Sequence, residues 1–491
     1  MKLVMPFLSL YLIWGNVYAK TAPPNIILLM ADDLGWGSVG YNGNKTIQTP
    51  ALDQMSKEGI RFDHFYAASA VCSPTRASCL TGRNPFRTGV FSANRGILRP
   101  EEITLPELLK EQAYTTGHFG KWHLGTFSTK IKDANRGGNQ HPELFNPPSK
   151  HGTDLYFATE SKVPTCDPML KPSTNATKSG WNAIKPGEAT LPFGTHYWSN
   201  ASGENKIVTE SLSGDDSKII MDRVLPFIEE AVKAKKPFLS VVWFHAPHLP
   251  CVAAPDLAKI YKDQEQEMRN YAGCITGLDR QVGRLRKKLA ELGVAENTMI
   301  WFCSDNGPEK KTPGETGGFR DRKRSLHEGG IRVPGLLVWP AKIKTARIET
   351  HACVTSDYLP TIMDILGIPR SRIPYELDGE SLLPLIEGKD FTRHHPIFFQ
   401  YANQLATSAG TFKFYKANGI AELYNLEIDP YEKNNIIKTK PEIAKTLEKQ
   451  WSAWQTSTKA SFEGAEYGRK SFKRIPQSWV DVTKMRKLKK K

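Results

Sequence analysis

The stretch Asn25-Ile26-Ile27-Leu28-Leu29-Met30-Ala31-Asp32-Asp33 indicates the fold class of this chain. Its six consecutive apolar residues show no polar alternation, which predicts a strand buried on both faces, as in a parallel sheet. Similar runs occupy residues 238–244, 298–303 and 335–339, and helical periodicity occupies 215–234 and 265–292. The alternation of strands and helices predicts an α/β fold with a mostly parallel sheet sandwiched by helices.

Polar side chains follow three of these strands at the point where each strand ends. The first strand runs into Asp32 and Asp33, the second into 245–248 with the sequence HAPH, and the third into 304–307 with the sequence SDNG. In open α/β sheets, ligands bind beyond the carboxyl ends of the strands. One polar strand end is more often an ordinary loop, but three together predict a shared site.

Asp32, Asp33 and Asp305 would repel one another in such a site. Two carboxylates about 4 Å apart repel by roughly 4 kcal/mol at an effective dielectric near 20, so a cation must compensate. Asn306 adds an amide oxygen, and the set contains no thiolate and no obligatory imidazole. Hard oxygen donors of this kind predict Ca²⁺, with Mg²⁺ as the alternative, rather than zinc.

The composition describes a large, basic, exported protein. The 491 residues are 40% hydrophobic, which is enough for a large core, so disorder is not expected. Residues 1–19 combine Lys2, an apolar stretch and a small-residue end at Ala19, the layout of a secretory signal. The formal net charge is +15; six positive charges lie in residues 484–491 and one is Lys2, which leaves +8 on the rest of the chain. We therefore expect a secreted, periplasmic or lysosome-like location, anionic partners, no nucleic-acid partner and no integral membrane segment.

Cys72 lies where a helix begins. Pro74 suits a first helical turn, and the pattern continues through Arg76 to Gly82. The chain has seven cysteines, an odd number, so at least one thiol stays unpaired, and Cys72 is our candidate. We interpret the other six as structural and leave their pairing open.

The stretch Cys72-Ser-Pro-Thr-Arg76 resembles the Cys-x-Pro-x-Arg signature of the type I sulfatases, which fold like alkaline phosphatase. Other matches occur in the same order between about residues 25 and 435: 31–35 (ADDLG), 120–125 (GKWHLG), 245–250 (HAPHLP), 304–307 (SDNG), Lys323 ahead of 328–334 (EGGIRVP), 378–384 (DGESLLP) and 423–435. Each fragment alone is weak, and their shared order carries the resemblance.

The resemblance implies a sulfuric ester hydrolase whose Cys72 is oxidised to formylglycine by a maturation enzyme. The hydrated aldehyde carries two hydroxyls, so one can attack sulfur and the other can later expel sulfate. Asp32, Asp33, residue 72, Asp305 and Asn306 would bind the metal. Arg76 and Lys121 would steady the hydrate, Lys121 and Lys323 would bind the sulfate, His248 would protonate the leaving alcohol, and His123 would accept a proton during sulfate release. His245 is a further candidate for substrate binding.

Simpler interpretations compete with these roles. Lys121 and His123 could be surface residues of a turn, His245 and His248 could be hydrogen-bonded core residues, and Lys323 could belong to a solvated basic run. Among functions, a two-zinc phosphatase of the same superfamily is disfavoured by Asn306. A formylglycine-dependent phosphonate or phosphodiester hydrolase, and a non-catalytic anion-binding homologue, stay open.

We expect the substrate to be a sulfated carbohydrate, cleaved by exo action, such as galactose, N-acetylgalactosamine or glucosamine sulfate. The irregular segment 126–205 is rich in Gly, Pro, Asn and aromatic residues and is interpreted either as a binding wall or as surface loops. The predicted organisation is a signal peptide 1–19, a catalytic domain 20–385, a C-terminal α+β subdomain 386–480 with an antiparallel sheet, and a basic tail 481–491. In the subdomain, 411–415 and 421–426 predict paired strands around residues 416–419 (KANG).

Overall fold

A computed structural model describes residues 22–139 and 141–467 of the chain. The predicted signal segment and basic tail lie outside these residues. Within them, no helix is both long enough and apolar enough to cross a membrane.

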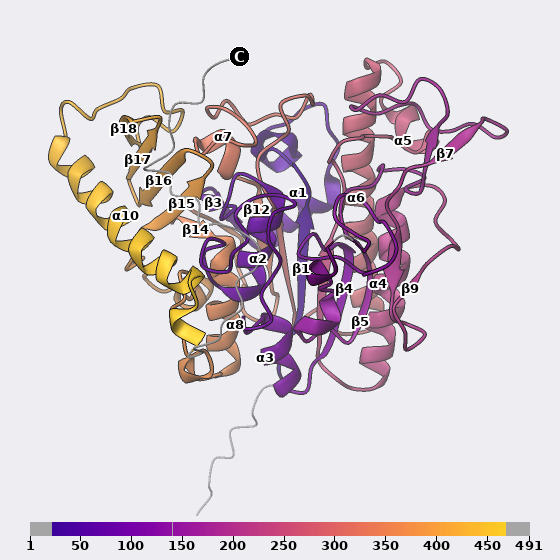
Figure 1. The fold of residues 1–491 in the computed structure, drawn as a ribbon, viewed down its shortest axis with the longest axis horizontal. Helices are drawn as coiled ribbons and strands as arrows, with labels where there is room; N and C mark the ends of the chain where they lie inside the picture. Colours follow the sequence, from indigo (N-terminus) through magenta and orange to yellow (C-terminus); the bar gives the residue numbers. More distant parts are fainter. Residues whose placement is uncertain (1–21, 140, 468–491) are drawn as a thin grey trace, which may run out of the picture.

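A ten-stranded sheet forms the centre of the molecule (Figure 1). Its five middle strands are all parallel and lie in the order β11 (Thr298–Ser304), β1 (Asn25–Ala31), β10 (Phe238–Trp243), β4 (Thr115–Lys121) and β5 (Leu155–Thr159). In register, Leu28 of β1 lies between Val241 of β10 and Trp301 of β11. The carboxyl ends of all five strands therefore lie along the same edge of the sheet.

Shorter strands extend the sheet on both sides. They are β12 (Gly335–Val338), β2 (Ile60–Phe62) and β13 (Arg347–Glu349) beyond β11, and β8 (Tyr197–Ser199) and β9 (Lys206–Ile207) beyond β5. β12 and β8 run antiparallel to the strands they join. The sheet is thus mostly parallel, as predicted, with antiparallel strands toward its edges.

Helices cover both faces because alternate side chains of each central strand point to opposite sides. Ile27 and Leu29 pack with α4 (Asp216–Lys233), α6 (Gln266–Glu291) and α1 (Pro50–Glu58). Ile26, Leu28 and Met30 belong to the core on the other face, where α2 (Cys72–Thr81), α3 (Leu105–Glu111) and α8 (Tyr358–Leu366) lie. Figure 1 shows the two helical layers.

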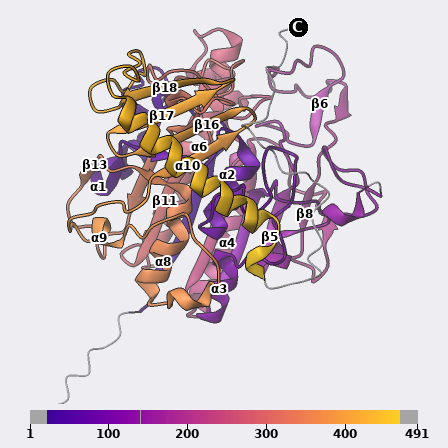
Figure 2. The ribbon, with the colours of Figure 1, turned by 60° about the vertical axis from the view of Figure 1, so that its left-hand side comes forward.

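A four-stranded antiparallel sheet follows in the last quarter of the described chain. It contains β15 (Ile397–Tyr401), β16 (Gln404–Ala409), β17 (Phe412–Ala417) and β18 (Ile420–Asn425) in sequential order. The predicted hairpin is confirmed: β17 pairs with β18 around Asn418 and Gly419, whose φ angles of 53° and 82° are left-handed. α10 (Pro441–Phe462) crosses this sheet (Figure 2) and buries Trp451 against Phe414 and Leu423.

The remaining elements are short. They are β3 (Phe65–Tyr66) paired with β14 (Cys353–Val354), β6 (Leu170–Pro172) paired with β7 (Thr190–Pro192), α5 (Pro255–Ile260), α7 (Glu328–Ile331) and α9 (Leu383–Ile386).

A buried ion cluster joins the C-terminal sheet to the main body. The Nζ atom of Lys413 on β17 lies 2.7 Å from a carboxylate oxygen of Glu328 on α7 and 3.0 Å from one of Glu432. All three side chains are completely buried, and Tyr66 donates a further hydrogen bond to Glu328. Because neither carboxylate can be hydrated, each depends on the same ammonium group.

We predict that Lys413→Met lowers the free energy of unfolding by about 3–5 kcal/mol, because it leaves two buried carboxylates without their shared cation. The matched control is Lys416→Met on the same strand, whose partner Glu448 is 41% exposed. That variant should cost about 1 kcal/mol or less. Urea unfolding measures both, and equal losses would contradict the importance of the buried cluster.

Candidate active site

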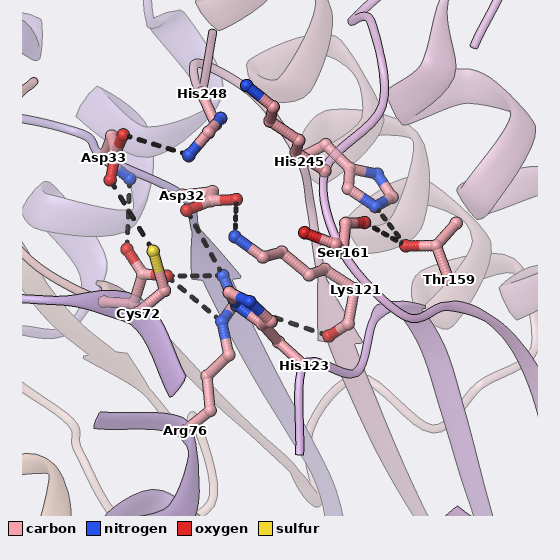
Figure 3. Close-up of polar contacts among 12 residues, drawn as sticks. Asp32, Asp33, Cys72, Arg76, Lys121, His123, Thr159, Ser161, His245 and His248 are labelled. Carbon is pink, nitrogen blue, oxygen red and sulfur yellow. Dashed lines mark hydrogen bonds and ion pairs between the residues drawn. The ribbon is translucent and has the colours of Figure 1, made fainter. Parts of the chain in front are cut away.

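The five parallel strand ends and the first residue of α2 meet at one place. β1 leads into Asp32 and Asp33, β11 into Asp305, and Lys121 is the last residue of β4. Figure 3 shows Asp32, Asp33 and Lys121 near Cys72, with His248 entering from the loop after β10. The structure thus brings together groups that are up to 290 positions apart in the chain.

Cys72 begins α2, as the position of Pro74 predicts. The whole helix is buried, and Gly82 ends it with a left-handed φ of 68°. The Arg76 side chain, one turn further, is completely buried and lies over the ring of Trp243 with its guanidinium carbon 5.1 Å from the ring centroid. α2 therefore presents its N-terminus, which favours negative charge, to the site.

Each of the three aspartates lies beside a different cation. Lys121 Nζ is 2.6 Å from Asp32 Oδ2, Lys323 Nζ is 2.6 and 2.7 Å from the two oxygens of Asp33, and Arg76 donates to Asp305 Oδ2 at 2.6 and 3.1 Å. All six side chains are at most 4% exposed.

These neighbours shift the acid–base properties of the carboxylates in different directions. Burial alone would raise the pKa of Asp33, but Lys323, His248 and Lys121 lower it well below its usual value. For Asp305, burial and the charge of Asp32 raise the pKa to about 6, against the opposing effect of Arg76. Asp33 is therefore more firmly ionised than Asp305.

The cluster has the oxygen donors that a hard cation requires. Ligand atoms of Asp32, Asp33, Cys72 and His248 all lie within 4.8 Å of one another. Asp32 Oδ1 and Asn306 Oδ1 are buried and have no hydrogen-bond partner among the described residues. Asn306 Nδ2 donates to Asp33 Oδ1 at 2.7 Å, which fixes the amide in the cluster. Unpaired buried oxygens are costly unless a ligand satisfies them, so this donor set fits Ca²⁺ or Mg²⁺.

Cys72 as a plain cysteine is a poor nucleophile in this position. Its side chain is buried, with Sγ 3.6 Å from Lys323 Nζ and 4.0 Å from Asp33 Oδ1. Burial raises the pKa of the thiol to about 12, although Lys121 and Lys323 oppose the shift. The thiol is therefore neutral at physiological pH, and the thiolate is the reactive form.

His248 and His123 reach the site through defined nitrogen atoms. His248 Nδ1 lies 2.6 Å from the carbonyl of Leu249 and must donate to it, which leaves Nε2 facing Asp33 Oδ2 at 3.6 Å. His123 Nε2 contacts Asn94 Oδ1 at 2.8 Å, and its Nδ1 is buried without a partner among the described residues. Burial and neighbouring cations lower the pKa of both rings well below the usual value, so both are neutral in the free protein.

His245 does not face the site, in contrast to our assignment of it to substrate binding. It is completely buried, with Nδ1 2.8 Å from Asp216 Oδ2 and Nε2 2.7 Å from Thr159 Oγ1. Because protein side chains occupy both nitrogens, the ring has no atom left for a substrate. Its contacts tie the loop after β10 to the end of β5 and to α4 (Figure 3).

Sequence reasoning missed three residues beside the site: Asn94, Thr159 and Ser161. Thr159 ends β5, and its hydroxyl lies 2.6 Å from the carbonyl of Ser161. Ser161 lies next to Lys121 in Figure 3. Thr159 and Ser161 would have been found as residues at the carboxyl end of a parallel strand, but β5, with its mixed polar and apolar sequence, was not identified as a strand. Asn94 lies in a turn, where no local sequence pattern marks it.

The aromatic residues of the segment 126–205 also lie elsewhere than expected. Trp181 and Trp198 are only 4% and 3% exposed, since Trp181 packs with Cys166 and Val252, and Trp198 stacks on Phe127. They are core residues of this segment and cannot stack on a sugar.

All seven cysteines are buried free thiols.

A hollow of about 260 Å³ with mixed polar and apolar walls lies beside the loop that carries His248. Leu249 and Cys251 of that loop line it together with Ser179, Lys311 and Pro313. Its walls offer hydroxyl and ammonium groups next to apolar side chains.

Comparison with known proteins agrees with this geometry. Residues 24–368 match the family model described as Sulfatase, and residues 314–457 match the one described as N-sulphoglucosamine sulphohydrolase, C-terminal. The chain belongs to the sulfatase family. It is a sulfatase with the alkaline phosphatase-like fold.

Its relatives differ in the substrates that their names state. The sulfatase is 32% identical to N-acetylgalactosamine-6-sulfatase of Canis lupus familiaris, over 80% of this chain and 71% of that protein. It is 29% identical to human steryl-sulfatase, over 82% and 76% of the two chains. The crystal structure of Ps i-CgsB in complex with k-i-k-neocarrahexaose superimposes with a TM-score of 0.74 at 27% identity, covering 89% and 93%. Family membership therefore does not fix the substrate.

We predict that substitution of His245 lowers the stability of the protein, whereas substitution of His248 lowers its turnover. His245→Leu should lower the free energy of unfolding by about 3–5 kcal/mol, because Asp216 stays buried without its partner. His248→Leu should leave stability within about 1 kcal/mol and lower kcat by roughly 10²- to 10⁴-fold, the range for loss of a general acid. Urea unfolding and steady-state kinetics measure the two effects. Lost turnover with full stability in His245→Leu would instead place that ring in contact with substrate.

Proposed function

We propose that this sulfatase releases inorganic sulfate from a sulfated carbohydrate, using a formylglycine made from Cys72 and a Ca²⁺ ion held by Asp32, Asp33, Asp305 and Asn306. The observation that carries the proposal is the state of Cys72. A buried, neutral thiol lies at the centre of the charge cluster, where a reactive group is needed and a thiol cannot act.

The modified residue and the metal would each provide something that the unmodified chain lacks. Formylglycine would supply a hydrated aldehyde with two hydroxyl groups, and Ca²⁺, with Mg²⁺ as the alternative, would supply positive charge against the sulfate oxygens. The conversion of Cys72 to formylglycine requires a formylglycine-generating maturation enzyme as a partner. This modification also agrees with export of the protein, which we propose from residues 1–19.

The side chains of the site fit the remaining tasks. The ammonium groups of Lys121 and Lys323 both act on Cys72, with Lys323 Nζ 3.6 Å from its sulfur, and they would hold sulfate oxygens as point charges. Arg76 orients Asp305 by two hydrogen bonds and keeps it beside residue 72.

His248 would protonate the leaving alcohol through Nε2. The lysines keep its ring neutral in the free protein, and the negative charge of a bound sulfate ester would oppose their effect and favour the protonated form. His123, with its buried and unpartnered Nδ1, would accept a proton during sulfate release.

We assign the leaving sugar to the hollow beside the loop that carries His248. Ser179 and Lys311 line this hollow and offer hydrogen bonds to the hydroxyl groups of a sugar. The names of the N-acetylgalactosamine-6-sulfatases and the neocarrahexaose in the Ps i-CgsB complex agree with a carbohydrate. Exo action on a terminal residue stays part of the proposal.

Removing the metal should abolish activity. Dialysis of the mature enzyme against a chelator should lower kcat/KM more than about 100-fold, because a cation contributes several kcal/mol to stabilising the transition state. Adding back Ca²⁺ or Mg²⁺ to separate samples identifies the ion. Full activity after exhaustive chelation would contradict the metal assignment.

Peptide mass spectrometry should detect an aldehyde at position 72 in protein matured by its native host. The same preparation should release sulfate from sulfated galactose, N-acetylgalactosamine or glucosamine, and Cys72→Ala should be inactive. Phosphonate monoesters, phosphodiesters and steroid sulfate serve as comparison substrates. An intact thiol in active enzyme would refute the formylglycine proposal, and preference for a phosphorus ester or a steroid would refute the substrate class.

A further inference from the structure

The charge cluster contains a fourth cation close to the sulfate-binding lysines, Lys162. Asp32, Asp33 and Asp305 are matched one to one by Lys121, Lys323 and Arg76. Lys162 has no such match. Among residues 22–139 and 141–467, no carboxylate lies within 4.0 Å of its ammonium group, and none of its side-chain atoms makes a hydrogen bond.

The backbone around Lys162 is anchored next to the site. Ser161, directly before it, is 3% exposed and lies beside Lys121 in Figure 3, and Asn135 donates a hydrogen bond to the Ser161 hydroxyl at 3.2 Å. Val163, directly after it, is completely buried. The hydroxyl of Thr195 donates to the Lys162 carbonyl at 3.1 Å. The side chain therefore starts from a fixed position at the rim of the cluster.

The amino group of Lys162 is within electrostatic range of the sulfate pocket. Its pKa is lowered by burial and by the charges of Lys121 and Lys323, while Asp33 and Asp32 act in the opposite direction. Lys162 in turn helps to lower the pKa of His248. A half-buried ammonium group without an ion-pair partner among the described residues, next to other cations, is suited to bind an anion from outside the chain.

We propose that Lys162 binds a second anionic substituent of the substrate, on the sugar that carries the scissile sulfate or on the sugar next to it. This inference rests on the proposed carbohydrate sulfatase function and narrows its substrate to sugars with at least two negative charges. The charges of Lys121, Lys323 and Arg76 are matched by the three aspartates. The metal ion of the proposed function would add two positive charges, which exceed the single negative charge of the scissile sulfate ester. A further cation is matched only when the substrate brings a further anion, either a second sulfate group or a uronate carboxylate.

The experiment compares mature wild-type enzyme with Lys162→Met on three substrates: a monosulfated hexosamine, the same sugar with a second sulfate, and a disaccharide that pairs the monosulfated sugar with a uronate. We expect the wild type to prefer one of the dianionic substrates by about tenfold or more in kcat/KM, since a charge-assisted hydrogen bond gives such a factor. Lys162→Met should lose that preference through KM and change the monosulfated substrate by less than about threefold. Whichever dianionic substrate loses its advantage identifies the second anion as sulfate or carboxylate.

Two further variants separate charge from structure. Lys162→Arg keeps the cation and should retain most of the preference. Lys185→Met removes an exposed lysine of the same irregular segment and should change nothing. Binding to Cys72→Ser gives a second readout without turnover: adding Lys162→Met should weaken the affinity for the dianionic sugar by about tenfold and leave that for the monosulfated sugar unchanged.

Equal losses on all three substrates would overturn the proposal and place Lys162 on the scissile sulfate. An unchanged ratio between substrates would overturn it as well. If mature wild-type enzyme hydrolyses none of the sugars and Cys72→Ser binds none, the proposed function fails and this inference fails with it, a result distinct from an unchanged ratio.

Discussion

The active site depends on the pairing of three buried carboxylates with three buried cations. Asp32, Asp33 and Asp305 could not stay ionised together in a water-free crevice without Lys121, Lys323 and Arg76 at 2.6 Å. The same pairing keeps the lysines charged, because Asp32 and Asp33 raise their pKa values against the effect of burial. A network of this kind positions charge before substrate arrives, so little reorganisation is needed during the reaction. It also explains why a thiol at its centre stays neutral: burial outweighs two lysines whose charge the aspartates already balance.

The parallel sheet makes this pairing possible. Residues that follow β11, β1, β10, β4 and β5 reach one edge because the five strands run in the same direction in adjacent positions. Each strand end contributes one kind of group: carboxylates from β1 and β11, imidazole from the loop after β10, an ammonium group from β4. An antiparallel arrangement would send alternate ends to opposite edges and separate the carboxylates from their cations. The strands β12 and β8, which flank the five parallel strands, can be antiparallel because neither supplies a residue to the cluster.

Strong apolar runs made much of this predictable from the sequence. β1, β10 and β11 are uninterrupted enough to be recognised as buried strands. The grouping of Asp32, Asp33, Asp305 and His248 followed because ligands bind beyond the carboxyl ends of such strands. β4 was not recognised, since Thr115–Lys121 contains two glycines and a histidine, and Lys121 was therefore placed by resemblance alone. His245 was misassigned because sequence does not show which way a loop side chain points; only the contacts with Asp216 and Thr159 reveal it. The buried positions of Trp181 and Trp198 depend on tertiary packing in the same way, and no local pattern distinguishes them from exposed aromatic residues.

The C-terminal sheet takes part in this site although it supplies no residue to it. Lys323 belongs to a loop whose backbone packs closely against Gly329 and Gly330 of α7, where an added Cβ atom would meet the carbonyls of Asp321 and Ser325 at 2.2 and 2.0 Å. The C-terminal sheet holds this loop from the outside: Arg320 and His327 contact Glu422, Gln404 accepts from the Leu326 amide, and Lys413 pairs with Glu328. Because Lys323 is the cation matched to Asp33, a shift of β16 to β18 would disturb the loop that places this cation beside the buried carboxylate. The contacts of the C-terminal sheet therefore connect its packing to the charge balance of the site.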